Sequence, residues 1–218
     1  MSQQGSGARV GAALLAATLC AAYLAPAAAQ SAGDGTRGKA LYAVCQACHG
    51  ANGEGNKELG APRLAGLAAV DLSRQIQNFK SGARGYDPSD LGAAQMKPIL
   101  ATLTTAQAVD DVVAYIVTLK APKPAATVSG DVAAGRTAYA ICSACHGQAG
   151  EGNSAQNAPR LAGQHDWFIV KQLQNFKSGV RGKGPGDTFG PLMAPMALTL
   201  PNDAAIANVA AFIATLEP

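Results

Sequence analysis

Apolar residues recur at the spacing of a single helix face near the end of each half of the chain. In the first half they are Val109, Val112, Val113 and Ile116, and in the second half Ile206, Val209, Phe212 and Ile213. Thr104 or Thr105 precedes the first set and Asn202 the second, and these residue types favour the amino-terminal cap of a helix. The pattern predicts one closing helix in each half.

Two more helices are predicted in the first half. One begins near Gly38, places Tyr42 on its apolar face and ends at a cysteine-containing motif. Another begins after Asp71, a favourable cap, and stops at Gly82. The loop that ends at Pro62 and the stretch from Arg84 to Met96 are predicted to be irregular. No alternating strand pattern of useful length occurs, so the fold class is all-α.

The second half of the chain repeats the first at a constant offset of 97 residues, without a gap. Matched pairs include 62–66 with 159–163 and 77–82 with 174–179. Residues 121–130, between the repeats, contain two prolines and several small residues, which suits a semi-extended linker. We expect two tandem domains, residues 30–120 and 131–218.

Residues 1–29 have the pattern of an export signal. Arg9 precedes an apolar run over 10–24, and the small residues up to Ala29 form a suitable cleavage site. The run is shorter than the roughly 20 residues that span a bilayer. We expect a cleaved signal peptide and a periplasmic protein, with a retained membrane anchor as the alternative. Cys20 is removed with the signal.

The composition favours domains that are built around a cofactor. Aromatic residues make up only 5% of the chain, which is little bulky material for two packed cores. A buried haem would supply a large apolar body to each core. The formal net charge is +3, and the basic residues are scattered rather than interleaved with aromatic ones. Nothing in this pattern indicates nucleic-acid binding.

Each repeat contains one Cys-x-x-Cys-His motif, at 45–49 and 142–146. This spacing is typical of c-type haem attachment, in which two thiols bond one porphyrin and the histidine binds its iron. The expected covalent residues are Cys45, Cys48, Cys142 and Cys145, and the expected iron ligands are His49 and His146. With the signal removed, the motifs use every cysteine. A redox dithiol or half of a zinc site is the alternative interpretation.

A methionine sulfur suits the second axial position, because it favours Fe(II) and raises the reduction potential. Beyond the signal the chain has three methionines, Met96, Met193 and Met196. Met96 and Met193 occupy equivalent repeat positions, each 47 residues after the motif histidine. We predict that these two bind iron, with Met196 as the alternative in the second half.

Residues in the loop after each motif are candidates for supporting the haem. Pro62 and Pro159 stand where a backbone carbonyl can accept a hydrogen bond from the axial histidine. Arg63 and Arg160 follow them and are candidates to pair with a haem propionate.

A further polar set recurs in the repeat, and it fits either the haem edges or a domain interface. Its members are Gln75, Asn78, Arg84, Gln172, Asn175 and Arg181. His165 has no repeat partner, since Ala68 occupies that position, and it is predicted to lie at the surface.

These features together resemble the c4-type dihaem cytochromes c. The resemblance rests on the paired motifs, the two Pro-Arg-Leu-Ala-Gly segments, the stretch 171–179 and the segment from Met193 to Met196. It implies two class I cytochrome c domains, each wrapped around one covalently bound haem with His/Met ligation, packed with their propionates near the interface. It also implies electron delivery to a membrane-bound terminal oxidase. Lys97-Pro98-Ile99 departs from the family pattern, which has a second methionine there.

We expect an electron carrier rather than an enzyme, because histidine and methionine at both irons leave no open coordination site. Expected partners are membrane-bound respiratory complexes, a bc1-type donor and a terminal oxidase, in transient docking, and peripheral membrane association fits this role. The alternative is a dihaem subunit of a dehydrogenase such as flavocytochrome c sulfide dehydrogenase. A dihaem enzyme is disfavoured, because the chain has no spare cysteine and one spare histidine.

Overall fold

The computed structural model describes residues 1–2 and 32–218. The predicted signal peptide, with Cys20 and the cleavage site near Ala29, lies outside the described residues apart from its first two positions. The first half contains α1 (Gly35–His49), α2 (Ala69–Ser81), α3 (Leu91–Ala101) and α4 (Ala106–Ile116). The second half contains α5 (Val132–Tyr139), α6 (Ser143–His146), the 3-10 turn Ser154–Gln156, α7 (Asp166–Ser178), α8 (Gly190–Leu198) and α9 (Asp203–Thr215).

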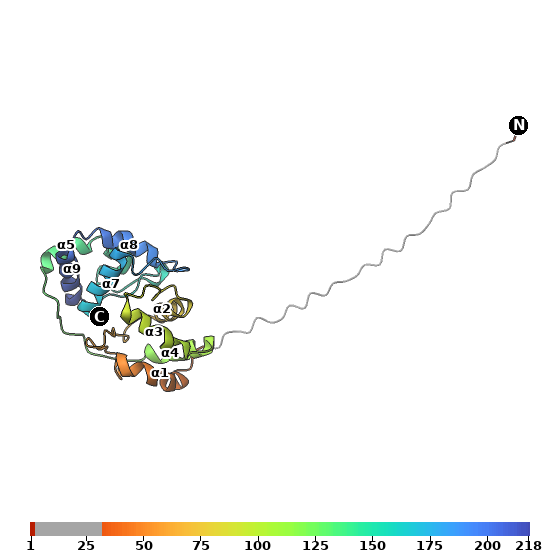
Figure 1. Ribbon diagram of the computed structural model, residues 1–218, viewed down its shortest axis with the longest axis horizontal. Coiled ribbons are helices and arrows are strands. Elements are labelled where there is room, and N and C mark those ends of the chain that lie inside the picture. The colour runs from red at the N-terminus through yellow and green to blue at the C-terminus, as the bar shows by residue number, and fades with distance from the viewer. Residues whose placement is uncertain (3–31) are drawn as a thin grey trace. The chain divides into compact units, whose positions relative to one another are not determined.

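The prediction of an all-α fold is confirmed for the described part of the chain. Within residues 32–218 the only β-type pairing consists of two isolated bridges, Asn56 with Ala61 and Asn153 with Ala158. Figure 1 shows that α1 lies beside α4, and that α5 lies beside α9. The same helix pair therefore opens and closes each half.

Two glycines allow these helix pairs to approach closely. A Cβ atom at Gly38 would lie 1.9 Å from the carbonyl oxygen of Asp111, and one at Gly135 would lie 1.9 Å from that of Asn208. Aromatic rings pack beside both crossings, Tyr42 on Tyr115 at 5.4 Å and Tyr139 on Phe212 at 5.2 Å between centroids. Contact at this distance requires that neither glycine carry a side chain.

Each half has its own apolar core, although aromatic residues are scarce. The first core includes Tyr42, Leu72, Phe79, Val112 and Ile116, and the second includes Tyr139, Ile169, Val209, Phe212 and Ile213. The closing helices supply much of both cores, as their spacing predicted. Thr105 and Asn202 cap them, accepting hydrogen bonds from the amides of Ala108 and Ala205 at 3.1 Å and 3.0 Å.

Two predicted helix starts are wrong. The first helix begins at Gly35, before the expected Gly38, because the Asp34 carboxylate accepts a hydrogen bond from the amide of Thr36 at 2.7 Å. Asp71 does not cap α2, which begins earlier, at Ala69, after a residue with no side-chain cap. Asp71 instead lies buried in the first turn.

The prediction of an irregular stretch from Arg84 to Met96 is also partly wrong. Helix α3 begins at Leu91, capped by Asp90, and α8 is its counterpart in the second half. Both helices contain an internal proline, Pro98 and Pro195, which removes one backbone donor from each. The two methionines of interest therefore lie on helices.

Within residues 32–218 no single helix is both long enough and apolar enough to cross a membrane. Only bent pairs reach the required length and hydropathy, α3 with α4 at 118° and α8 with α9 at 114°.

One acidic residue distinguishes the first helix pair from the second. Asp111 is 3% exposed and accepts hydrogen bonds from Arg37 Nε and the amide of Asp34, both at 2.7 Å. The hydrogen bond from Arg37 and then that from Asp34 lower the pKa of Asp111 well below its ordinary value of 3.8. In the second half Asn208, which does not titrate, accepts from the amide of Asp131 at 2.8 Å.

We expect Gly135→Ala to destabilise the protein by at least about 2 kcal/mol, because the new methyl group would clash with the backbone of α9. Urea unfolding of the holoprotein measures the change. Gly92→Ala is the matched control, since Gly92 also lies in a helix and its added Cβ would meet nothing closer than 4.0 Å. Equal stability of the two variants would show that the close crossing does not matter.

We expect the contribution of Asp111 to folding to decrease in acid. A carboxyl group with a depressed folded-state pKa stabilises fully above its unfolded pKa, here near 3.8, and loses that effect as the pH falls toward the folded value. Asp111→Asn should lower stability at neutral pH and flatten its dependence on pH below about 4. Urea titrations at several pH values test this, and an unchanged pH slope in the variant would contradict it.

Candidate functional site

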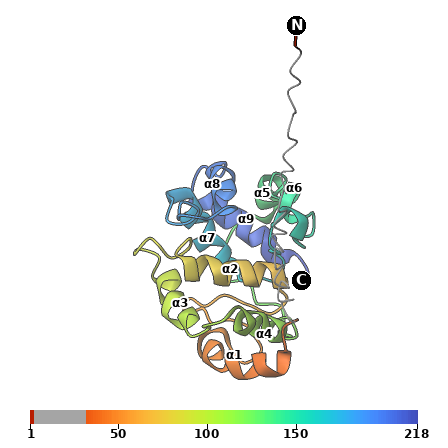
Figure 2. The same cartoon turned by 90° about the vertical axis from the view of Figure 1, so that its right-hand side faces the viewer.

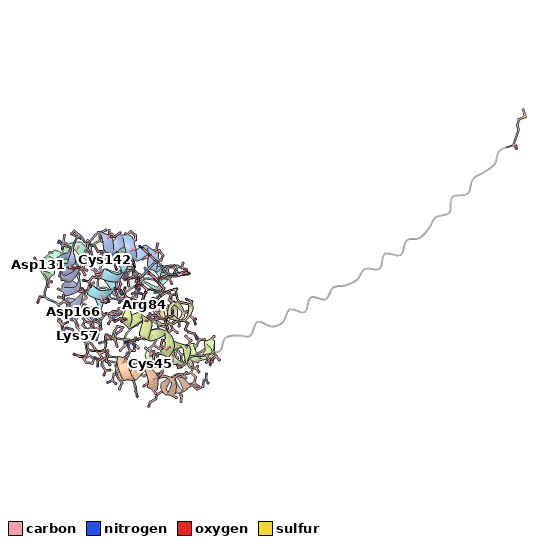
Figure 3. All side chains as sticks on the ribbon, in the orientation of Figure 1. Cys45, Lys57, Arg84, Asp131, Cys142 and Asp166 are labelled. Carbon is pink, nitrogen blue, oxygen red and sulfur yellow. The ribbon has the colours of Figure 1, made fainter. Side chains whose placement is uncertain are left out.

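The two cysteine motifs occupy equivalent places at the end of the opening helix of each half. The first copy forms the last turn of α1, while the second begins at Cys142, after a break in the helix, and continues through α6. Cys45, Cys48, Cys142 and Cys145 form no disulfide bonds. Cys45 and Cys142 are half-buried, and Cys48 and Cys145 are exposed. Figure 3 shows Cys45 and Cys142 in different halves.

The environment of these thiols argues against a redox dithiol. Burial raises the pKa of Cys45 to about 11 and also raises that of Cys142. Reactive dithiols depend on a lowered pKa, since the thiolate is the nucleophile. A zinc site receives no support either, because in the described ranges no three histidine, cysteine or acidic side chains converge.

The motif histidines are held in matching positions by backbone carbonyls. His49 and His146 are each 5% exposed. Nδ1 of His49 lies 2.8 Å from the carbonyl oxygen of Pro62, and Nδ1 of His146 lies 2.7 Å from that of Pro159. A carbonyl can only accept, so Nδ1 carries the proton and Nε2 keeps the lone pair that binds a metal.

Burial lowers the pKa of both histidines, and it outweighs the proline carbonyls, which act in the opposite direction. A neutral imidazole is the form that coordinates iron. The contact that the sequence analysis expected from Pro62 and Pro159 is therefore present, in the geometry of a metal-ligating histidine.

Hydrogen bonds also hold the loop that follows each histidine. The Tyr42 hydroxyl donates to the carbonyl of Gly50 at 2.8 Å, and the amide of Gly55 donates to the carbonyl of His49 at 2.8 Å. The second half repeats both contacts, from Tyr139 to Gly147 and from Gly152 to His146. The polar loop thus closes around the histidine.

The candidate methionines differ in burial. Met96 on α3 is half-buried and packs against the first core. Met193 on α8 is also half-buried, whereas Met196, one turn later, is 37% exposed. Met193 is therefore the more buried of the two methionines on α8.

The arginines after the prolines differ from each other. Arg63 is 7% exposed, and its guanidinium donates to the carbonyls of Ala65, Ala121 and Pro122. The structure therefore gives Arg63 partners in its own loop and in the linker, and its pairing with a haem propionate stays a prediction. Arg160 is half-buried and lines a hollow between the halves.

The recurrent polar set includes residues of the interface between the halves. Arg84 and Arg181 each donate at 2.6 Å to the glutamine of their own half, Gln75 and Gln172, and at 3.1 Å to the glutamine of the other half. Each guanidinium also lies 4.5 Å above a phenylalanine ring. Helices α2 and α7, which supply the glutamines, run along the boundary in Figure 2.

Burial lowers the pKa of Arg84 to about 10, and burial followed by repulsion from Arg84 lowers the pKa of Arg181. Asn175 joins the interface by donating to Asp90 of the first half at 2.9 Å. Arg84 Nε is a buried donor without a partner in the described part of the chain. A carboxylate is the kind of group that such a donor takes.

Several interface residues were not expected from the sequence. The Tyr86 hydroxyl donates to the carbonyl of Gly179 at 2.7 Å and accepts from the amide of Lys183 at 3.0 Å. The prediction that His165 lies at the surface is wrong, because its Nε2 contacts the carbonyl of Glu54 in the first half at 2.8 Å. Both residues lie at positions where the two repeats differ, since Tyr86 corresponds to Lys183 and His165 to Ala68. This difference was the one sequence feature that could have pointed to their interface role.

Comparisons with known proteins agree with this architecture. The family model for cytochrome c matches residues 35–120 and again 132–217. Cytochrome c4 from Azotobacter vinelandii is 34% identical over 200 residues, which is 87% of this chain and 92% of the relative. The chain belongs to the c4-type cytochromes c. Each of its two cytochrome c domains carries one c-type haem, and the chain is an electron carrier rather than an enzyme.

Two solved structures are also similar. Reduced recombinant cytochrome c4 from Pseudomonas stutzeri gives a TM-score of 0.69 at 28% identity, over 85% of this chain and 100% of that one. Thiosulfate dehydrogenase from Marichromatium purpuratum gives 0.69 at 32% identity, over 83% of this chain and 40% of that one. A curated thiosulfate dehydrogenase electron acceptor from Stutzerimonas stutzeri is 35% identical, covering 70% of this chain and 72% of the relative.

We expect Tyr42→Phe to lower stability by about 1 kcal/mol, since it removes the hydrogen bond that the Tyr42 hydroxyl donates to the carbonyl of Gly50. Thermal unfolding, followed at the haem absorption band, measures the loss. Tyr115→Phe is the control, because position 115 of the first half corresponds to Phe212 of the second. If the control lost as much stability as Tyr42→Phe, the hydroxyl contact would not be the cause.

Proposed function

We propose that this c4-type cytochrome is an exported, periplasmic carrier that passes electrons from a bc1-type or similar respiratory donor to a membrane-bound terminal oxidase. The proposed axial pairs are His49 with Met96 and His146 with Met193. When bound, each haem supplies one-electron chemistry. The chain contributes the two ligands, the covalent attachment and the exclusion of water.

The matched placement of the two methionines carries the ligand proposal. Met96 and Met193 occupy equivalent positions on α3 and α8, and both are half-buried, whereas Met196 is exposed. A thioether opposite a neutral histidine raises the reduction potential and fills the sixth coordination site. An iron with both sites filled transfers electrons without binding a substrate, in keeping with a carrier.

We further propose domain boundaries at residues 30–120 and 131–218, with 121–130 as the linker and cleavage near Ala29. The family matches at 35–120 and 132–217 support these limits. Periplasmic location is supported by the export-type pattern of the amino terminus and by the cytochrome c4 relatives.

A second candidate role is electron acceptance from a sulfur-compound dehydrogenase. Relatives described as thiosulfate dehydrogenase electron acceptors support it, at 35% and 36% identity. The match to the oxidase subunit CcoP of an Azospirillum species, 31% identical over 62% of this chain, supports the oxidase as partner. The two roles are compatible, since one carrier can accept from the first and deliver to the second.

The ligand assignment is tested by the near-infrared charge-transfer band of Fe(III)–thioether ligation in the oxidised holoprotein. Met96→Ala and Met193→Ala should each remove about half of the band and lower one of two reduction potentials. Met196→Ala is the control and should keep the full band. If Met196→Ala removes half of it while Met193→Ala does not, the second ligand is Met196.

The partner assignment is tested by stopped-flow mixing. The reduced protein should be oxidised rapidly by membranes that contain a terminal oxidase, and the oxidised protein should be reduced by a bc1-type complex. Rapid reduction by a thiosulfate dehydrogenase, without oxidation by the membranes, would favour the second role alone. A slow reaction with all three would refute both.

A further inference from the structure

The side chain of His165 belongs to the second half but contacts the first. It precedes α7, and its imidazole stacks on Trp167 at 5.3 Å between ring centroids. Its Nε2 lies 2.8 Å from the carbonyl oxygen of Glu54, which can only accept, so His165 donates this hydrogen bond. Glu54 lies in the loop that follows the motif of the first haem.

This hydrogen bond continues to the first motif histidine. The carbonyl of Glu54 and the amide of Gly55 belong to one peptide unit, and that amide donates to the carbonyl of His49 at 2.8 Å. A donor at the carbonyl end of a peptide polarises it and strengthens the bond that its N–H makes. His165 is thus linked through a single peptide to the backbone of the axial ligand.

Gln164, the residue before His165, forms hydrogen bonds with a later segment of the same loop. Its Oε1 accepts from the amide of Arg63 at 3.1 Å, and its Nε2 donates to the carbonyl of Arg63 at 2.9 Å. Arg63 directly follows Pro62, whose carbonyl receives the Nδ1–H of His49. Gln164 and His165, the interdomain clamp, therefore fix both backbone segments that hold the ligand of the first haem.

The repeat places Leu67 and Ala68 at the corresponding positions, and neither can make such hydrogen bonds. Glu151 and Gly152, the counterparts of the gripped peptide, instead line a hollow of about 220 Å³ together with Ala68. This space is large enough to hold several water molecules. The proximal loop of the second haem therefore faces a polar hollow, where that of the first faces an imidazole.

We infer that His165 makes the two haems inequivalent, acting from the second domain to raise the reduction potential of the first haem alone. This inference rests on the proposed electron-carrier function. The His165 donor polarises the Glu54–Gly55 peptide, so that the positive end of its N–H dipole, which points at the carbonyl of His49, is strengthened, and the imidazole keeps water away from this loop. Both effects disfavour the extra positive charge of Fe(III). Gln164 acts in the opposite direction, because its oxygen accepts from the amide of Arg63 and so strengthens the Pro62 carbonyl that accepts from His49. His165 and Gln164 are both positioning residues in this arrangement.

The test is a potentiometric titration of the holoprotein in which haem-methyl proton resonances report each centre separately. Cys145→Ala, which changes porphyrin attachment in the second half only, assigns the resonances. His165→Ala should lower the potential of the first haem and leave the second unchanged. His165→Gln, which keeps an N–H donor, should restore most of the difference. Ala68→His should raise the potential of the second haem by filling the hollow.

A control separates this effect from a loosened interface. Tyr86→Phe removes two hydrogen bonds between the halves, at 2.7 Å and 3.0 Å, that involve neither motif loop. The Tyr86→Phe variant should leave the reduction potentials of both haems unchanged. Equal shifts of the two haems in His165→Ala, no shift in either, or the same shift in Tyr86→Phe would each overturn the inference. Two His/Met haems in the wild type would leave the proposed function standing whatever these variants do.

Discussion

Each half of the molecule depends on one hydrogen bond, from Nδ1 of its motif histidine to a proline carbonyl 13 residues later. The bond sets the tautomer of the ring and leaves Nε2 for iron. It also ties the end of the opening helix to a segment without regular structure. The tyrosine hydroxyl and the glycine amide close the same loop around the histidine. A chain with so few aromatic residues can order these loops because their polar groups are paired.

The contacts between the halves divide into a symmetric and an asymmetric part. The symmetric part is the quartet of Arg84, Arg181 and their two glutamines, in which each half supplies the same groups. Two buried guanidinium groups that share their acceptors repel each other, and each also loses its hydration. The quartet is therefore stable only with the glutamine oxygens and the phenylalanine faces around it. The asymmetric part includes His165, and it gives the equivalent loops of the two repeated domains different neighbours.

Local patterns predicted much of the fold, because helix periodicity and the covalent motif depend on neighbouring residues. The closing helices followed from helical spacing, and the histidine–proline contact followed from the tendency of an axial imidazole to donate its other N–H to a backbone carbonyl. Helix α3 was missed because its first half lies inside the stretch from Arg84 to Met96 that was predicted to be irregular, yet Asp90 caps it. The linker contact of Arg63 and the interdomain contact of His165 were missed because the carbonyls of Ala121 and Glu54 lie 58 and 111 residues away in sequence. Long-range contacts of this kind leave no periodic trace, although a broken repeat marks where to look.

The linker between the domains is bound at both ends. Arg63 of the first domain holds the carbonyls of Ala121 and Pro122, and Asp166 of the second accepts from the amides of Thr127 and Val128. Hydrogen bonds from both domains therefore hold the linker that joins them. The path of the linker is therefore fixed by contacts with both domains, unlike that of a freely fluctuating chain. We expect a linker held in this way to keep the two domains at a nearly constant separation.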